Sequence, residues 1–237
     1  MGEDEGPRRQ RHRRHEGEAV RIIECEQRTP EWFAARLGRL TASRAADMLA
    51  TIKTGEAAAR RNLRTQLVLE RLTGVSQESP YQSDAMRQGI EREADALLWY
   101  EAQTGQIVQR SGFVAHDDLM AGASLDGHVG DFAGIVEAKC PLASTHLETL
   151  ESGAIPSDYQ KQIVHQLWIS GARWCDYVSY HPDFPEPLRL RIVRMMRDDG
   201  RIAEYETSAR VFLSEVDGRL AALTMLPAWL EASNAHA

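Results

Sequence analysis

The sequence lacks several features that would point to a membrane-bound or disulfide-stabilised protein. No apolar run approaches the roughly 20 residues that a membrane-spanning helix needs, and the first residues lack the apolar core of a secretory signal. The 237 residues include three cysteines, Cys25, Cys140 and Cys175, and no CxxC pair. This cysteine pattern disfavours a disulfide framework and a four-cysteine metal site, and we expect a reducing, cytoplasmic compartment.

The chain also lacks an excess of positive charge. It has 28 Lys and Arg residues against 35 Asp and Glu residues, for a formal net charge of −7. Nucleic acids favour basic surfaces, but local patches matter more than the total. Residues 8–14 contain five arginines, and we predict that residues 1–18 are a disordered basic tail, either solvated or in contact with phosphates. Residues 19–237 are predicted to form a single domain.

Apolar periodicity and end signals predict the order of helices and strands. Helices are expected at 29–38, 41–49, 56–73, 84–103, 156–171 and 199–232, the last broken at Pro227. Strands are expected at 107–114, 119–126, 133–140, 174–180 and 188–195. This order predicts an α/β (α+β) fold in which helices flank a mixed β-sheet.

The segment ASLDGHVGDFAGIVEAKCP, residues 123–141, contains Asp126, Glu137 and Lys139. Side chains alternate along a strand, so Glu137 and Lys139 share one face, and Asp126 approaches them if strands 119–126 and 133–140 pair. Two carboxylates beside a lysine predict an Mg²⁺ or Mn²⁺ site for phosphodiester hydrolysis. The alternative is an ordinary hairpin with a cross-strand Glu–Lys pair.

Glu93 is a carboxylate on the apolar face of the helix predicted at 84–103. Its neighbours on that face are Met86, Ile90, Leu97 and Tyr100. Glu93 is either a structural acid paired with Arg87 or Lys139, or a further acid of the same site.

Five segments in order resemble the λ-type phage exonucleases, also called YqaJ-type viral recombinases, of the PD-(D/E)xK nuclease superfamily. They are EWFAARLGRLTASRAADML, AMRQGIEREADALLWYEAQTG, ASLDGHVGDFAGIVEAKCP, DYQKQIVHQLWISGARWCDYVSYHPDFP and LRLRIVRMMRD with the last helix. One departure is Leu125 where the family motif has proline, which removes no ligand. The resemblance implies a restriction-endonuclease-like fold and digestion of duplex DNA from a 5′ end, dependent on Mg²⁺ or Mn²⁺, that leaves a 3′ overhang.

The resemblance also implies roles for individual residues. Asp126, Glu137 and the Ala138 carbonyl match metal ligands, Lys139 matches the catalytic lysine, and Glu93 matches the helical acid. Four residues match contacts to the DNA and its terminal 5′-phosphate: Arg36, Ser43, Ser124 and Gln162. From the residues alone, we favour the simpler interpretations, in which Arg36 is a helix C-terminal cation and Gln162 a solvated helix residue.

The partners implied by the resemblance are double-stranded DNA ends, a single-strand annealing protein and two further copies in a homotrimer. The setting would be the cytoplasm of a bacterial host that carries a phage or prophage. Two other functions stay open: an endonuclease or a repair or CRISPR-associated nuclease of the same fold, and a DNA-end-binding module without catalysis.

Overall fold

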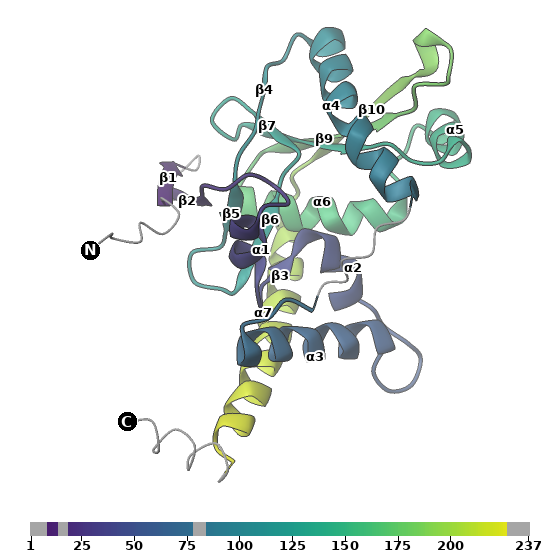
Figure 1. Cartoon of the computed structure of the whole chain (residues 1–237). Coiled ribbons are helices and arrows are strands. Elements are labelled where there is room, and N and C mark those ends of the chain that lie inside the picture. The colour runs from purple at the N-terminus through teal and green to yellow at the C-terminus, as the bar shows by residue number, and fades with distance from the viewer. Residues whose placement is uncertain (1–8, 14–18, 78–83, 227–237) are drawn as a thin grey trace.

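The computed structural model describes residues 9–13, 19–77 and 84–226, which form two mixed β-sheets surrounded by helices (Figure 1). Sheet A has the order β1-β2-β5-β6-β3, formed by Arg9–Arg13, Ala19–Ile23, Phe113–Ala115, Ala121–Ser124 and Leu40–Thr41. Sheet B has the order β10-β9-β8-β7-β4, formed by Leu190–Met196, Trp174–Tyr180, Gly134–Lys139, Gly127–Val129 and Val108–Gln109. The expected α/β class is confirmed, although two sheets replace the single sheet that was predicted.

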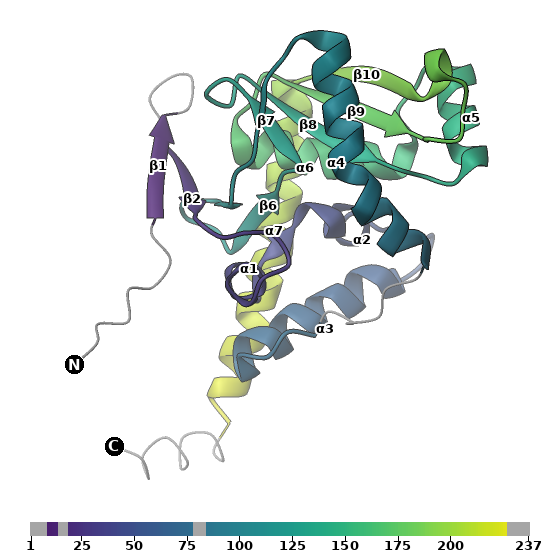
Figure 2. The same ribbon diagram turned by 45° about the horizontal axis from the view of Figure 1, so that its top comes forward.

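Sheet B lies between two helices, α4 (Asp84–Thr104) and α6 (Ser157–Ser170) (Figure 2). On one face, Val136 and Ala138 of β8 pack with Leu97 and Tyr100 of α4. On the other face, Ile135 packs in the core that includes the apolar side chains of α6. The predicted alternation along residues 133–140 is therefore confirmed, and it turns Glu137 away from α4.

The long helix α7 (Asp199–Thr224) packs against α6 and, further along, against α3 (Ala58–Thr73) (Figure 1). Its first turn is capped by Asp198, whose side chain accepts a hydrogen bond from the Arg201 N–H. Gly74 ends α3 in the left-handed conformation, with φ at 69°. The remaining helical segments are α1 (Pro30–Arg36), the 3₁₀ turn η1 (Ala42–Arg44), α2 (Ala45–Met48), α5 (Ala143–Ser152) and the 3₁₀ turn η2 (Glu186–Leu188).

The strand expected at 119–126 does not pair with residues 133–140. It forms β6 of sheet A, and the separate strand β7 pairs antiparallel with β8, with Gly127 opposite Val136. The chain passes from one sheet to the other at Leu125 and Asp126. Three-residue strands such as β7 are too short to show a period in the sequence.

The helix expected at 41–49 is also corrected. Leu40 and Thr41 form β3, which pairs parallel with Ala121 and Gly122 of β6, and the helical turns begin only at Ala42. Leu40 and Thr41 are both buried, so their backbone groups need hydrogen-bond partners, and β6 supplies them. Helix α5 was not predicted.

One stretch of the segment predicted to be a disordered tail forms a strand. Arg9–Arg13 form β1, which pairs antiparallel with β2, with Arg9 opposite Ile23. Pairing at a sheet edge uses backbone groups, so an arginine-rich composition does not exclude it. Residues 1–8 and 14–18, the side chain of Met86 and the expected break at Pro227 lie outside the described residues.

No helix in the described ranges combines the length and the apolar character that crossing a bilayer requires.

A buried histidine links β6 to α6 and α7. The ring of His165 contacts the Gly122 carbonyl through Nε2 (2.9 Å) and the Tyr205 hydroxyl through Nδ1 (2.7 Å). A carbonyl only accepts hydrogen bonds, so Nε2 carries the proton and Nδ1 accepts from Tyr205. Burial and, to a smaller extent, His116 lower the pKa of His165 to about 3. The hydrogen bond to the Gly122 carbonyl has the opposite effect on this pKa but does not outweigh burial.

This histidine is expected to make stability fall with acid. Between the ordinary pKa of 6.5 and about 3, the unfolded chain takes up a proton at this position and the folded chain does not. The contribution of His165 to the free energy of unfolding is fully present above pH 6.5. It decreases by at most about 1.4 kcal/mol per pH unit as the pH falls. Urea titrations across this range should therefore give a shallower pH slope for His165→Gln than for the wild type. Equal slopes would show that His165 titrates normally in the folded protein.

Candidate active site

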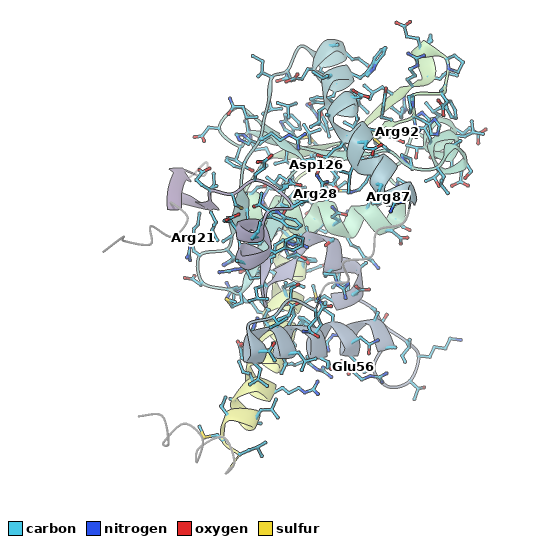
Figure 3. The ribbon with its side chains drawn as sticks, in the orientation of Figure 1. Arg21, Arg28, Glu56, Arg87, Arg92 and Asp126 are labelled. Atoms are coloured by element: carbon cyan, nitrogen blue, oxygen red, sulfur yellow. The ribbon has the colours of Figure 1, made fainter. Side chains whose placement is uncertain are left out.

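A cleft of about 560 Å³ brings together residues from six separate parts of the chain. Its lining includes Arg28 before α1, Glu93 of α4, Asp126 between the sheets, Ala138 and Lys139 of β8, and Tyr159 of α6. Figure 3 labels Arg28 and Asp126 close to each other, and Arg92 of α4 also lines the cleft. Four of the residues expected at the catalytic centre therefore line one cavity.

Asp126 lies against the backbone of β8. Its Oδ2 accepts a hydrogen bond from the Ala138 N–H at 2.9 Å. The β7–β8 register, continued by one residue, places Asp126 opposite Glu137. Burial and the negative charge of Glu137 raise the pKa of Asp126 well above its ordinary value, against the opposing effects of Lys139 and the Ala138 N–H. The two carboxylates therefore repel each other in a place with little solvent, which a bound cation would relieve.

Glu137 is almost completely buried, with 1% of its surface exposed. Its Oε1 pairs with the Lys139 ammonium and accepts a hydrogen bond from the Gln162 Nε2 at 2.5 Å. Its Oε2 accepts a hydrogen bond from the Gln166 Nε2. Burial alone would lower the pKa of Lys139, but the carboxylates of Glu137 and Asp126 together raise it above the ordinary value. Lys139 is therefore a cation in this arrangement.

Glu93 is held by two arginines. Its Oε1 accepts a hydrogen bond from Arg110 at 2.8 Å, and its Oε2 accepts one from Arg28 at 3.2 Å. The Glu93 side chain is 12% exposed, whereas those of Arg28 and Arg110 are 41% and 52% exposed. Arg28 has a φ of 70°, an uncommon conformation for a residue other than glycine. The three side chains together carry one excess positive charge at the cleft.

Arg36 and Ser124, two of the expected DNA contacts, meet at the end of sheet A. Arg36 Nη1 donates to Ser124 Oγ at 3.5 Å, and the Trp32 indole donates to the same oxygen at 2.7 Å. The guanidinium of Arg36 lies 4.1 Å from the centroid of the Trp32 ring. Ser43 lies in the 3₁₀ turn η1, which contacts β6, and its hydroxyl is 3.4 Å from that of Thr41. Gln162, the fourth expected contact, instead donates to Glu137.

The donor chemistry suits a hard cation. Asp126, Glu137 and the Ala138 carbonyl offer oxygen ligands, which Mg²⁺ and Mn²⁺ prefer, and Mg²⁺ usually keeps several waters and binds few carboxylates. Across residues 9–13, 19–77 and 84–226, no group of three or more His, Cys, Asp and Glu side chains is arranged to hold a metal ion. A cation here would therefore depend on the backbone carbonyl and on water or substrate oxygens.

Sequence reasoning missed Arg28, Arg110 and Gln166. Gln166 lies four residues after Gln162, so helical spacing places both on one face of α6, and this signal was readable in advance. Arg28 and Arg110 lie in connections between helices and strands, where no periodic pattern indicates which way a side chain points.

Residues 31–173, more than half of the chain, match the family described as the YqaJ-like viral recombinase domain. The alkaline exonuclease LHK-Exo from Laribacter hongkongensis is 41% identical, and the match covers 83% of this chain and 96% of that one, with a TM-score of 0.75. Its complex with dAMP gives the same identity and coverage with a TM-score of 0.76. These matches confirm the expected fold class.

A phage-related exonuclease from Haemophilus somnus 129PT has a TM-score of 0.64 at 12% identity, over 78% of this chain and 96% of that chain. At that identity it supports the fold alone. No curated protein matches this chain.

Proposed function

Because the chain belongs to the YqaJ-like viral recombinase family and is a DNA exonuclease, we propose that it digests duplex DNA from 5′ ends with Mg²⁺ or Mn²⁺. The product would be a duplex with a 3′ single-stranded overhang, as in recombination. The observation that carries this proposal is that Asp126 and Lys139 line one cleft, with the buried Glu137 carboxylate paired to Lys139 directly behind it. We assign the nuclease to a single domain of residues 19–237.

Each catalytic residue has a role that its surroundings support. Asp126, Glu137 and the Ala138 carbonyl would hold the cation, which would supply Lewis acidity for activating water and polarising the phosphodiester. Lys139, protonated beside Glu137, orients the attacking water and stabilises negative charge on the phosphate. Glu93 is the further acid at the edge of the cleft, positioned by Arg28 and Arg110.

The terminal 5′-phosphate would bind where Arg36 and Ser124 meet, with Ser43 contributing from the turn η1 that contacts β6. The guanidinium offers paired N–H donors that match phosphate oxygens, and the hydroxyls add further donors. Gln162 would reach the substrate from the other side of Glu137, which it already contacts.

Strand polarity is tested with linear duplex carrying a label at one 5′ or 3′ end. We expect Mg²⁺-dependent release of nucleotides from the 5′-labelled end first, faster with a 5′-phosphate than with a 5′-hydroxyl. Release from the 3′ end first would reverse the proposed polarity. Cleavage of covalently closed circles would favour an endonuclease, and tight end binding without digestion would favour a non-catalytic module.

The proposal extends to the setting of the reaction. The substrate is double-stranded DNA ends, the assembly a homotrimer, the partner a single-strand annealing protein, and the compartment the cytoplasm of a bacterial host. Sedimentation of the full chain tests the trimer, with a mass three times 26.6 kDa as the expected result.

Arg28 is expected to contact a DNA phosphate, since it lines the cleft and shares Glu93 with a second cation. Arg28→Gln should weaken binding of linear duplex in EDTA and lower the slope of log Kd against log salt by about one. Arg210→Gln is the matched control, because Arg210 pairs with Glu206 on α7. A salt slope equal to that of the wild type would contradict the contact.

A further inference from the structure

Glu137 is held by two glutamines from consecutive turns of α6. Gln162 donates to one carboxylate oxygen and Gln166 to the other. The two glutamines are four residues apart, so their side chains project from the same face of the helix. Each oxygen of the carboxylate therefore has a neutral donor, and the orientation of the whole group is restricted.

Gln166 occupies a position at which an apolar residue would be the simpler choice. It is 1% exposed, and its neighbours on either side, His165 and Leu167, are buried as well. Its Nε2 is used by Glu137, and its Oε1 has no hydrogen-bond partner among the described residues. A buried amide with one unused carbonyl destabilises the fold relative to a hydrocarbon of the same size, which points to a role at Glu137.

The amide has a property that a cation in its place would lack. Lys139 also contacts Glu137, but its positive charge competes with any metal ion for the same oxygen. A glutamine N–H stabilises the ionised carboxylate without adding charge, so the carboxylate keeps its full attraction for a cation. Such partners orient ligand carboxylates, and their loss typically weakens metal binding.

We infer that Gln166 is a positioning residue that, with Gln162, holds the Glu137 carboxylate in place as a metal ligand. The inference rests on the proposed function, since it needs Glu137 to bind a cation. Gln166 does not touch the reacting atoms, and its effect reaches the reaction through Glu137 alone.

The test is a calorimetric titration of the full chain with Mn²⁺ in the absence of DNA. Gln166→Met keeps the length of the side chain and removes the donor, and we expect its Mn²⁺ affinity to be about 10-fold to 100-fold weaker than that of the wild type. Gln160→Leu is the matched control, because Gln160 lies on the same helix and donates to the Ile155 carbonyl instead. Its Mn²⁺ affinity should equal that of the wild type.

A second measurement separates positioning from a general loss of structure. The Mg²⁺ concentration for half-maximal digestion should rise by about the same factor, while the rate at saturating Mg²⁺ changes little. If Gln166→Met does not fold, judged by its thermal transition, Gln166→Leu is measured in the same way.

The outcomes distinguish this inference from the function on which it rests. If the wild type binds Mn²⁺ and digests DNA, and the Gln166 variant binds Mn²⁺ equally well, the positioning role is wrong and the nuclease stands. If the wild type neither binds the cation nor digests DNA, both fail.

Discussion

Asp126→Asn is expected to reduce Mg²⁺-dependent digestion of linear duplex by about a thousandfold or more, because it removes a charged metal ligand. The change is small in shape. Asparagine keeps an oxygen that can accept the Ala138 N–H, so the junction between β6 and β7 has no reason to rearrange. The loss should therefore come with a loss of Mn²⁺ binding in calorimetry, and with an unchanged circular dichroism spectrum.

The same substitution is expected to stabilise the metal-free protein. Asp126 is half-buried and lies close to Glu137, and the raised pKa of its carboxyl indicates that the surroundings disfavour the charge. A neutral amide removes that repulsion, and we expect a gain of about 1 kcal/mol in the free energy of unfolding in EDTA. Asp118→Asn, on the exposed turn between β5 and β6, is the control. It should change neither the digestion rate nor the free energy of unfolding in EDTA. Destabilisation by Asp126→Asn would mean that the carboxylates do not strain the metal-free site.

Lys139→Met is expected to reduce digestion by about 10²-fold to 10⁴-fold, the usual range for a group that handles protons or orients water. Its effect on the cation should be opposite to that of Asp126→Asn. The Lys139 ammonium pairs with Glu137, and removing its positive charge leaves the carboxylates more available to Mn²⁺. Mn²⁺ affinity should therefore stay equal or become tighter while the rate falls.

Lys161→Met is the matched control for this experiment. Lys161 lies on α6 next to Gln162, but it lines a separate cavity with Arg201 and Tyr205. Its digestion rate should match the wild type. Retention of full activity by Lys139→Met would show that the lysine is only the partner of Glu137 in a salt bridge.

The sequence predicted the position of Glu137 and Lys139 from the alternation of side chains, which depends only on the local backbone. It placed Asp126 near them for a partly wrong reason. The expected partner strand was 119–126, whereas the pairing strand is Gly127–Val129, which begins one residue after Asp126. The predicted proximity is nevertheless correct, because Asp126 lies in the short link between β6 and β7 and directly precedes Gly127.

The division into two sheets could not be predicted, because the chain changes sheet within two residues, Leu125 and Asp126, and the next strand, β7, has only three residues. The edge strand β3 was missed because it has two residues and pairs with a strand about 80 positions away in sequence. The partners of Glu93 were missed for a similar reason. Arg28 and Arg110 come from different connections, and only the folded chain brings both of them to the carboxylate of Glu93. Gln166 had a readable spacing, but its hydrogen bond depends on how α6 sits against β8.

The central claim is that this cleft makes the chain a metal-dependent exonuclease that needs a DNA end. The most direct measurement follows nucleotide release from 5′-phosphorylated linear duplex and from covalently closed circles of the same sequence, each with Mg²⁺ and with EDTA. We expect rapid release from the linear duplex with Mg²⁺, no release from the circles or in EDTA, and release by Asp126→Asn that is slower by about a thousandfold or more. Digestion in EDTA, or digestion of linear duplex by Asp126→Asn at the wild-type rate, would contradict the account.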